Sequence, residues 1–269
     1  RFVREMAAVV TLASILGYSV LPRRTALVGL VRRGFPTVSG SCKRLGKRVS
    51  LSTRAAGQVQ EDLSYSPAEL FEVMQPPESS HEGFGHARPT GRTKPRSEVH
   101  KDGDWHHSVH VWLHDQQSDK VLIQRRSMYK DTNPGKLDVS AAGHITFGDS
   151  SHDTAVKELS EELGIVAPPD LVRKYFTAVS EEKGETEKFG SYICREFQDI
   201  YIVRKDELES KIGSKVEVKV ADGEVDEALW VNTAHLRKSL EQRDPEYVSR
   251  TGSYVSALFE AMQSESSCQ

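Results

Sequence analysis

The segment Gly143–Ile165, GHITFGDSSHDTAVKELSEELGI, places three carboxylates at helical spacing. Glu158, Glu161 and Glu162 stand at positions i, i+3 and i+4, so they share one face if the segment is an α-helix. Carboxylates at this spacing repel one another. Hard divalent cations relieve such repulsion, because Mg²⁺ binds proteins through one or two carboxylates together with substrate phosphates. The spacing therefore indicates either a cation site or an ordinary solvated acidic face.

The helix that carries these carboxylates is predicted over Asp153–Leu163, and Gly164 ends it. Its apolar residues recur with a period of 3.6, which is typical of a helix that packs one face on a sheet. The residues that we expect to be buried are Ala155, Val156, Leu159 and Leu163.

The wider spacing resembles the Nudix box: Gly, five residues, Glu, seven residues, Arg–Glu–aliphatic, one residue, Glu–Glu, one residue, Gly–aliphatic. Here the pattern reads Gly143, Asp149, Lys157–Leu159, Glu161–Glu162 and Gly164–Ile165. Asp149 stands where the family has Glu, and Lys157 stands where it has Arg. Lys cannot reproduce the planar bidentate contact that an Arg makes with a carboxylate.

The resemblance implies an α/β fold, the Nudix α/β/α sandwich with a mixed sheet, in which the box forms a loop–helix–loop catalytic motif. It implies Mg²⁺ or Mn²⁺ as the cofactor and a small-molecule diphosphate as the substrate. The metal ligands that it implies are Gly143, through its carbonyl, Glu158, Glu161 and Glu162.

Beyond the box, the runs Thr93–His100, Trp105–Trp112 and Asn133–Asp138 are similar to plant and bacterial Nudix hydrolases that resemble type I isopentenyl diphosphate isomerase. The resemblance implies a diphosphate-binding role for the basic residues after the second predicted strand, which are Arg125, Arg126 and Lys130. It also implies a second metal site at His100, His106 and His144, which Glu196 can join. The alternatives are a solvated basic surface and histidines that only pack around a strand.

Two residues oppose the isomerase reaction. The isomerase has a Cys just before the Gly–His of the box, where this chain has Ala142, and a second Glu where it has Gln198. Pyrophosphate hydrolysis needs neither residue, because it requires metal ions, an aligned water and a carboxylate base. The leading hypothesis is thus a Mg²⁺-dependent hydrolase of a nucleoside- or prenyl-diphosphate type of substrate. The alternatives are an isomerase-like enzyme and a catalytically silent binding scaffold.

The catalytic residues predicted for the hydrolase are Glu158, Glu161 and Glu196. The general base is left open among four carboxylates, of which Glu196 is favoured; the others are Glu158, Glu181 and Glu182.

Hydrophobic periodicity predicts the remaining elements. Strands are expected at 70–74, 109–113, 120–124, 174–179, 200–203 and 228–231, and a short strand followed by a loop at 137–145. Closing helices are expected at 234–240 and 254–262. Loops are expected at 75–92, from its Pro, Ser and Gly residues, and at 181–188, from its charges.

The two ends of the chain differ in charge. Residues 1–60 hold eleven basic residues and one acid, and no acid lies between Met6 and Gln60. This composition is typical of organelle transit peptides. We therefore predict a disordered targeting peptide at 1–60 and a Nudix domain at 61–269 with its core at about 93–240. The expected location is an organelle, plastid ahead of mitochondrion, with the cytoplasm as the alternative.

The rest of the chain is acidic, with 25 basic and 38 acidic residues, which argues against a nucleic-acid partner. The apolar run at 7–21 is shorter than the about 20 residues that a membrane span needs, so no stable membrane association is expected in the mature form. The three cysteines lie far apart, which excludes a disulfide scaffold. The sequence leaves the oligomeric state open.

Overall fold

The structure is a computed structural model, and it describes residues 69–78, 83–130, 132–186, 190–220 and 223–264. The chain divides into two units, Arg1–Val59 and Gln60–Gln269, and the description concerns the second. The predicted targeting peptide at 1–60 lies outside the described residues.

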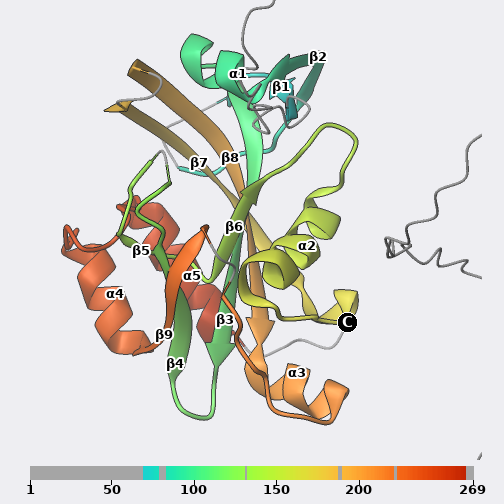
Figure 1. The fold of residues 1–269 in the computed structure, drawn as a ribbon, viewed down its shortest axis with the longest axis vertical. Helices are drawn as coiled ribbons and strands as arrows, with labels where there is room; N and C mark the ends of the chain where they lie inside the picture. The colour runs from blue at the N-terminus through green and yellow to red at the C-terminus, as the bar shows by residue number, and fades with distance from the viewer. Residues whose placement is uncertain (1–68, 79–82, 131, 187–189, 221–222, 265–269) are drawn as a thin grey trace, which may run out of the picture. The chain divides into compact units, whose positions relative to one another are not determined.

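The strands form one mixed sheet of nine strands in the described part of the chain (Figure 1). They are β1 (Leu70–Met74), β2 (Pro89–Pro95), β3 (Trp105–Asp115), β4 (Lys120–Arg126), β5 (Leu137–Asp138), β6 (Ala141–His144), β7 (Arg173–Thr186), β8 (Gly190–Arg204) and β9 (Val225–Asn232). The long strand β3 runs parallel to β8 and antiparallel to β1, β4 and β6. Strand β4 continues into an antiparallel pair with β9.

Helices cover both faces of this sheet, with α2 on one side and α4 and α5 on the other (Figure 1). The helices are α1 (Arg96–Asp102), α2 (Ser151–Leu163), α3 (Lys205–Ile212), α4 (Thr233–Glu241) and α5 (Gly252–Gln263), with a 3₁₀ turn η1 (Pro169–Leu171). The expected α/β sandwich with a mixed sheet is confirmed. Among the described residues, no helix has both the length and the apolar character that crossing a membrane requires.

Alternation along β3 assigns its side chains to the two layers. Val109, Val111 and Leu113 are fully buried and pack with α2, while Trp112 belongs to the cluster under α5. Because successive strand residues point to opposite faces, His106 and His110 share the α5 side with Trp112. The sheet therefore separates two sets of polar groups, one facing α2 and one facing α5.

Helix α2 forms as its sequence predicts. Ser150 caps it by accepting a hydrogen bond from the Asp153 N–H, and Gly164 ends it in the left-handed conformation at φ +66°. Among the residues expected in the core, Ala155, Leu159 and Leu163 have no exposed surface, whereas Val156 is half-buried. The face of the helix that carries these buried residues thus packs on the sheet.

The prediction of a loop at 181–188 is wrong for most of that range. Strand β7 continues to Thr186 and pairs in register with β8 as a long hairpin. One of the charges that favoured a loop is matched across the strands, since Arg195 Nε lies 2.7 Å from Glu181 Oε2 and cross-strand ion pairs stabilise a hairpin. The loop expected at 75–92 is also too long, because β2 begins at Pro89. Helices α1 and α3 were not predicted; both are short, with seven and eight residues.

Candidate active site

Glu158 lies against the main chain of Gly143, where α2 packs on β6. A β-carbon built on Gly143 would stand 2.1 Å from Glu158 Oε1, so the carboxylate occupies the space that a side chain would fill. Burial raises the pKa of Glu158 to about 8, and the charges of Glu162 and Glu161 add to the effect. The Glu158 carboxylate therefore packs directly against the main chain of Gly143.

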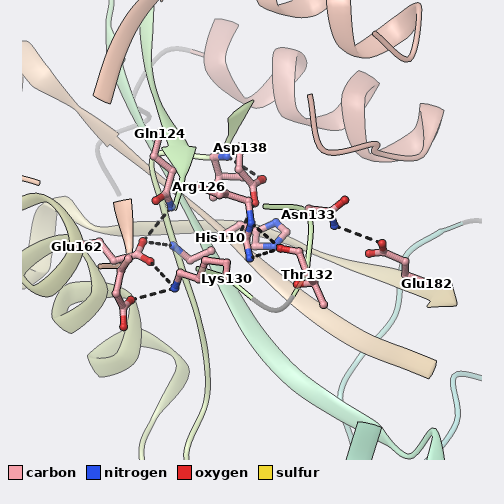
Figure 2. Close-up of polar contacts among 12 residues, drawn as sticks. His110, Gln124, Arg126, Lys130, Thr132, Asn133, Asp138, Glu162 and Glu182 are labelled. Carbon is pink, nitrogen blue, oxygen red and sulfur yellow. Dashed lines mark hydrogen bonds and ion pairs between the residues drawn. The ribbon is translucent and has the colours of Figure 1, made fainter. Parts of the chain in front are cut away.

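Glu162 is the second carboxylate of this site and is only 3% exposed. Its Oε2 accepts hydrogen bonds from the Ala142 N–H and from Gln124 Nε2, each at 3.0 Å. Burial nevertheless raises the pKa of Glu162 to about 7. Figure 2 shows Gln124 of β4 directed at this carboxylate, so the strand and the helix hold it in place together.

Glu161 does not converge with these two residues. Its side chain is 57% exposed and its Oε2 lies 3.6 Å from Lys157 Nζ, one turn back on the helix. Lys157 itself is 55% exposed. Among the described residues, the lysine that replaces the family's Arg thus forms its ion pair with the exposed Glu161 and not with Glu158 or Glu162.

Of the three basic residues, only Lys130 reaches the box carboxylates. Its Nζ lies 3.9 Å from Glu162 Oε1 (Figure 2). Arg125 instead donates to the Gly135 carbonyl and to Glu246, both at 3.0 Å. Arg126 donates to the Thr132 carbonyl through Nε and Nη2 and to Asp138 through Nη1. Both arginines therefore fix the 127–136 loop that carries Lys130.

Glu224 is a further carboxylate beside this site, and the sequence interpretation missed it. Its Oε2 lies 3.0 Å from Lys130 Nζ, and its charge contributes to raising the pKa of both Glu158 and Glu162. It directly precedes β9, whose Val225 pairs with Arg126 of β4. The acidic run before β9 was a visible signal, but its relevance depends on this strand pairing.

The three histidines predicted as a second metal site do come together. One ligand atom from each of His100, His106 and His144, with the sulfur of Cys194, lies within 4.8 Å of the others. Glu196 Oε1 lies 3.1 Å from His144 Nε2 and 3.6 Å from His106 Nε2. Cys194 was not predicted as a member. Its signal is the strand period, because Cys194 and Glu196 are two residues apart and share a face of β8.

Burial and hydrogen bonds shift the pKa values of several side chains in this histidine cluster. Burial lowers the pKa of His100 to about 3, and burial also lowers the pKa of His144, so these imidazoles are neutral. Burial opposes ionisation of Glu196, but hydrogen bonds from His106 and His144 hold its pKa well below the ordinary value. Burial raises the pKa of the Cys194 thiol. The cluster combines three imidazoles with one carboxylate and one thiol.

Glu196 lies on the other face of the sheet from the box carboxylates. It follows the alternation of Ile200 and Ile202, which pack under α5, whereas Tyr201 and Val203 pack with α2. Its partners are His106, His144 and Gln198, whose Nε2 donates to Glu196 Oε2 at 2.7 Å. The predicted base Glu196 is thus grouped with the histidines and not with Glu158 and Glu162.

Known proteins match this chain over the same region. A family model described as NUDIX domain matches residues 104–251. Nudix hydrolase 3 of Arabidopsis thaliana is 40% identical over 162 residues, which are 59% of this chain and 20% of that protein. An uncharacterized Nudix hydrolase of Clostridium acetobutylicum is 42% identical over 120 residues, which are 44% of this chain and 55% of that protein.

Among solved structures, a Deinococcus radiodurans protein aligns with a TM-score of 0.43 at 17% identity, over 71% of this chain and 98% of that one. The match of this chain to the plant and clostridial relatives spans only 20% and 55% of their lengths.

Proposed function

The chain belongs to the NUDIX domain family, and we propose that it is a Mg²⁺- or Mn²⁺-dependent hydrolase that cleaves the phosphoanhydride bond of a diphosphate joined to an organic group. The observation that carries the proposal is the placement of two carboxylates, the half-buried Glu158 and the buried Glu162, against the Gly143–Ala142 main chain with Lys130 beside Glu162.

The residues present fit a hard divalent cation. Glu158 fills the cradle that the missing β-carbon of Gly143 leaves open, and burial with neighbouring negative charge raises its pKa. Such a group of oxygen donors is what Mg²⁺ and Mn²⁺ prefer. Glu158, Glu162 and the Gly143 carbonyl would hold the cation, with Glu161 at the exposed edge. When bound, the cation supplies charge neutralisation for the diphosphate oxygens and lowers the pKa of water.

Lys130 would contact the diphosphate. Its ammonium lies between Glu162 and Glu224 at 3.9 and 3.0 Å, so it carries positive charge to the edge of the acidic site. Arg125 and Arg126 act through the loop, because their guanidinium groups are bonded to main-chain carbonyls at 135 and 132. We assign substrate contact to Lys130 and positioning of its loop to the two arginines.

Glu224 is the carboxylate best placed to accept the proton of the attacking water. It is 56% exposed, so water reaches it, and it shares Lys130 with Glu162. Of the earlier candidates, Glu158 would hold the cation. The other three are engaged elsewhere: Glu196 by histidines, Glu181 by Lys183 and Arg195, and Glu182 by Asn133 and Tyr192. We therefore propose Glu224 in place of Glu196 as the general base.

A phosphate-release screen of the full chain with Mg²⁺ tests the function. The panel contains ADP-ribose, NADH and isopentenyl diphosphate, with an added phosphatase that releases phosphate from monophosphate products. Glu162→Gln should reduce kcat at least a hundredfold, since one anionic ligand is lost. The exposed Glu260→Gln on α5 should leave it unchanged. Absence of Mg²⁺-dependent release from every compound would favour the alternative of a silent binding scaffold.

We further propose that the cluster of His100, His106, His144, Cys194 and Glu196 binds a transition metal. Imidazole and thiol donors favour Zn²⁺ or Co²⁺ over Mg²⁺. With Co²⁺, thiolate coordination would give a near-ultraviolet charge-transfer band that Cys194→Ser removes. Glu162→Gln should leave that band intact. Equal spectra for the parent and Cys194→Ser would exclude the thiol as a ligand.

A further inference from the structure

Gln124 is a buried amide among apolar side chains on the sheet face that α2 covers. On β4, Leu122 packs in the same cluster as Leu159 of α2, and Gln124 shares its face because strand residues alternate. Across the sheet Gln124 pairs with Ala228 of β9, which packs against that cluster. Gln124 is only 1% exposed. A buried amide is costly unless both of its polar atoms have partners, so its contacts indicate its role.

The amide nitrogen of Gln124 has a partner, and the amide oxygen has none among the described residues. Nε2 donates to Glu162 Oε2 at 3.0 Å, whereas Oε1 is buried and receives no hydrogen bond. Exchange of the two atoms would not satisfy the oxygen, because a Glu162 carboxylate that holds a cation is ionised and only accepts. The amide therefore directs its NH₂ at Glu162 and keeps Oε1 as an acceptor without a donor.

This unpaired oxygen lies beside the proposed cation site. The nitrogen and oxygen of one amide are about 2.2 Å apart, so Gln124 Oε1 is within about 5 Å of the Glu162 oxygen that Nε2 contacts (Figure 2). The Ala142 N–H donates to that same Glu162 oxygen at 3.0 Å. The carboxylate is thus held from two sides, and a cation bound to it would have Gln124 Oε1 close by.

We propose that Gln124 is a positioning residue of the cation site. Its Nε2 holds Glu162, and its Oε1 accepts a hydrogen bond from a water that the divalent cation keeps. Mg²⁺ retains several of its waters in proteins, and each of them has hydrogens to donate. Partners of this kind orient the ligands of a metal and contribute to its affinity. The role rests on the cation binding in the proposed function and deepens it.

The test follows Mn²⁺ alone, so it is independent of turnover. The full chain is titrated with Mn²⁺, and the free ion is measured by electron paramagnetic resonance. Binding that Glu162→Gln abolishes is assigned to the box, which separates it from ions at the histidine cluster. Gln124→Met keeps the length of the side chain without its polar atoms and should weaken this binding about 10- to 100-fold. Gln117→Met, in the exposed turn between β3 and β4, is the matched control and should bind as the parent does.

Water exchange distinguishes the two atoms of the amide. Relaxation of ¹⁷O in the solvent, corrected with Glu162→Gln, gives the number of waters on the ion and their residence time. Gln124→Met should shorten the residence time about threefold or more, because one hydrogen bond is lost, and should leave the number of waters unchanged. Gln124→Glu keeps an oxygen acceptor and loses the NH₂, so the residence time should not fall below the parental one. If Gln124→Met fails to fold, Gln124→Asn, which withdraws the oxygen by one methylene, replaces it with the same expectation.

The outcomes separate this role from the proposed hydrolase. Equal Mn²⁺ affinity and residence time in Gln124→Met and the parent would overturn the role and leave the hydrolase standing. Weaker binding with an unchanged residence time would also overturn it, since the amide would then act through Glu162 alone. One additional water on the ion in Gln124→Met would replace it with direct coordination by Oε1. A parent without Mn²⁺ at Glu162 would overturn both the role and the metal dependence, whereas the expected binding without phosphate release would overturn only the hydrolase.

Discussion

Gly143 and Glu158 are in such close contact that no β-carbon fits between them. The site of a β-carbon on Gly143 lies 2.1 Å from Glu158 Oε1 and 2.3 Å from its carboxyl carbon. This contact joins the end of β6 to the middle of α2, so the glycine of the box has a steric reason to be glycine. It also places the Glu158 carboxylate directly against the main chain of Gly143.

Replacement of Gly143 by Ala should therefore displace the Glu158 carboxylate. We expect a loss of at least a hundredfold in kcat/KM and a loss of about 1–3 kcal/mol in the free energy of unfolding, which is typical of overpacking. Gly252→Ala is the matched control, because a β-carbon there meets nothing within 4 Å. An active Gly143→Ala enzyme with parental Mg²⁺ dependence would show that the close approach has no role in the site.

The metal-free protein should lose stability as pH rises. Burial raises the pKa of Glu162 to about 7 and that of Glu158 to about 8, above the ordinary value of 4.5. A carboxyl whose folded-state pKa is raised contributes stability that is complete below its unfolded pKa and is lost as pH passes the folded pKa. In EDTA, the free energy of unfolding should thus fall between about pH 4.5 and 8.

Glu162→Gln should reduce this slope, because its amide does not ionise. At pH 8 the variant should exceed the parent by about 3 kcal/mol in EDTA, the order of magnitude set by the shift of Glu162. Saturating Mg²⁺ should reverse the order by stabilising only the parent. Urea denaturation at several pH values checks both effects, and identical slopes for the two proteins would contradict the assignment of Glu162 as the titrating group.

The contribution of Asp138 to the free energy of unfolding should depend on pH in the opposite sense to that of Glu158 and Glu162. It lies between two arginines, accepting from Arg126 Nη1 at 3.2 Å and from Arg250 Nη2. Burial opposes its ionisation, but the charges of Arg250 and Arg126 hold its pKa below the ordinary value. Its contribution is therefore present above the unfolded pKa and lost as pH falls through the folded one.

Asp138→Asn should cost about 3–5 kcal/mol at neutral pH, because it leaves two guanidinium groups without their anion. The loss relative to the parent should shrink in acid, where the parent's carboxylate is protonated as well. Thermal unfolding at pH 7 and pH 3 measures the difference. A constant difference at both values would show that the carboxylate's charge is not what matters.

The box carboxylates illustrate how far the sequence could be interpreted. The 3.6-residue period correctly predicted α2, three of the four residues expected on its buried face and the proximity of Glu158 to Glu162, because all are local properties of one helix. It did not predict that Glu161 is 57% exposed. That difference depends on how β4 and β6 pack beside the helix, which helical spacing does not contain.

The members contributed by other strands could not be predicted for the same reason. Glu224 reaches Lys130 through the pairing of β9 with β4, and Cys194 reaches His106 through the parallel pairing of β8 with β3. Tyr254 meets His110 across 144 residues of chain. Strand pairing and layer packing set these contacts, and one sequence does not fix the order of strands in a sheet.

Glu224→Gln should affect turnover more than binding. If Glu224 accepts the proton of the attacking water, the amide lowers kcat by about 10²–10⁴ while KM changes little. Glu217→Gln is the control, since that side chain is 79% exposed and pairs only with Lys219 among the described residues. Steady-state kinetics at several pH values decides the case, and a kcat within threefold of the parent would remove Glu224 from the role of base.

The last prediction separates hydrolysis from isomerisation. Ala142 has no ionisable group, and Gln198 donates through Nε2 to Glu196 at 2.7 Å, so its amide supports a carboxylate and exchanges no proton. Migration of a double bond in isopentenyl diphosphate needs one group to deliver a proton to carbon and another to remove one. We therefore expect no deuterium in the allylic positions after incubation with Mg²⁺ and Zn²⁺ in deuterated water, as measured by proton NMR.

Ala142→Cys alone should not create the isomerase activity, because Gln198 still cannot ionise. The double variant Ala142→Cys/Gln198→Glu supplies both groups, and any allylic deuterium should appear first in that protein. Deuterium uptake by the parent, without phosphate release, would overturn the hydrolase assignment. It would require another side chain of the histidine cluster, such as Glu196 or Cys194, to carry the proton.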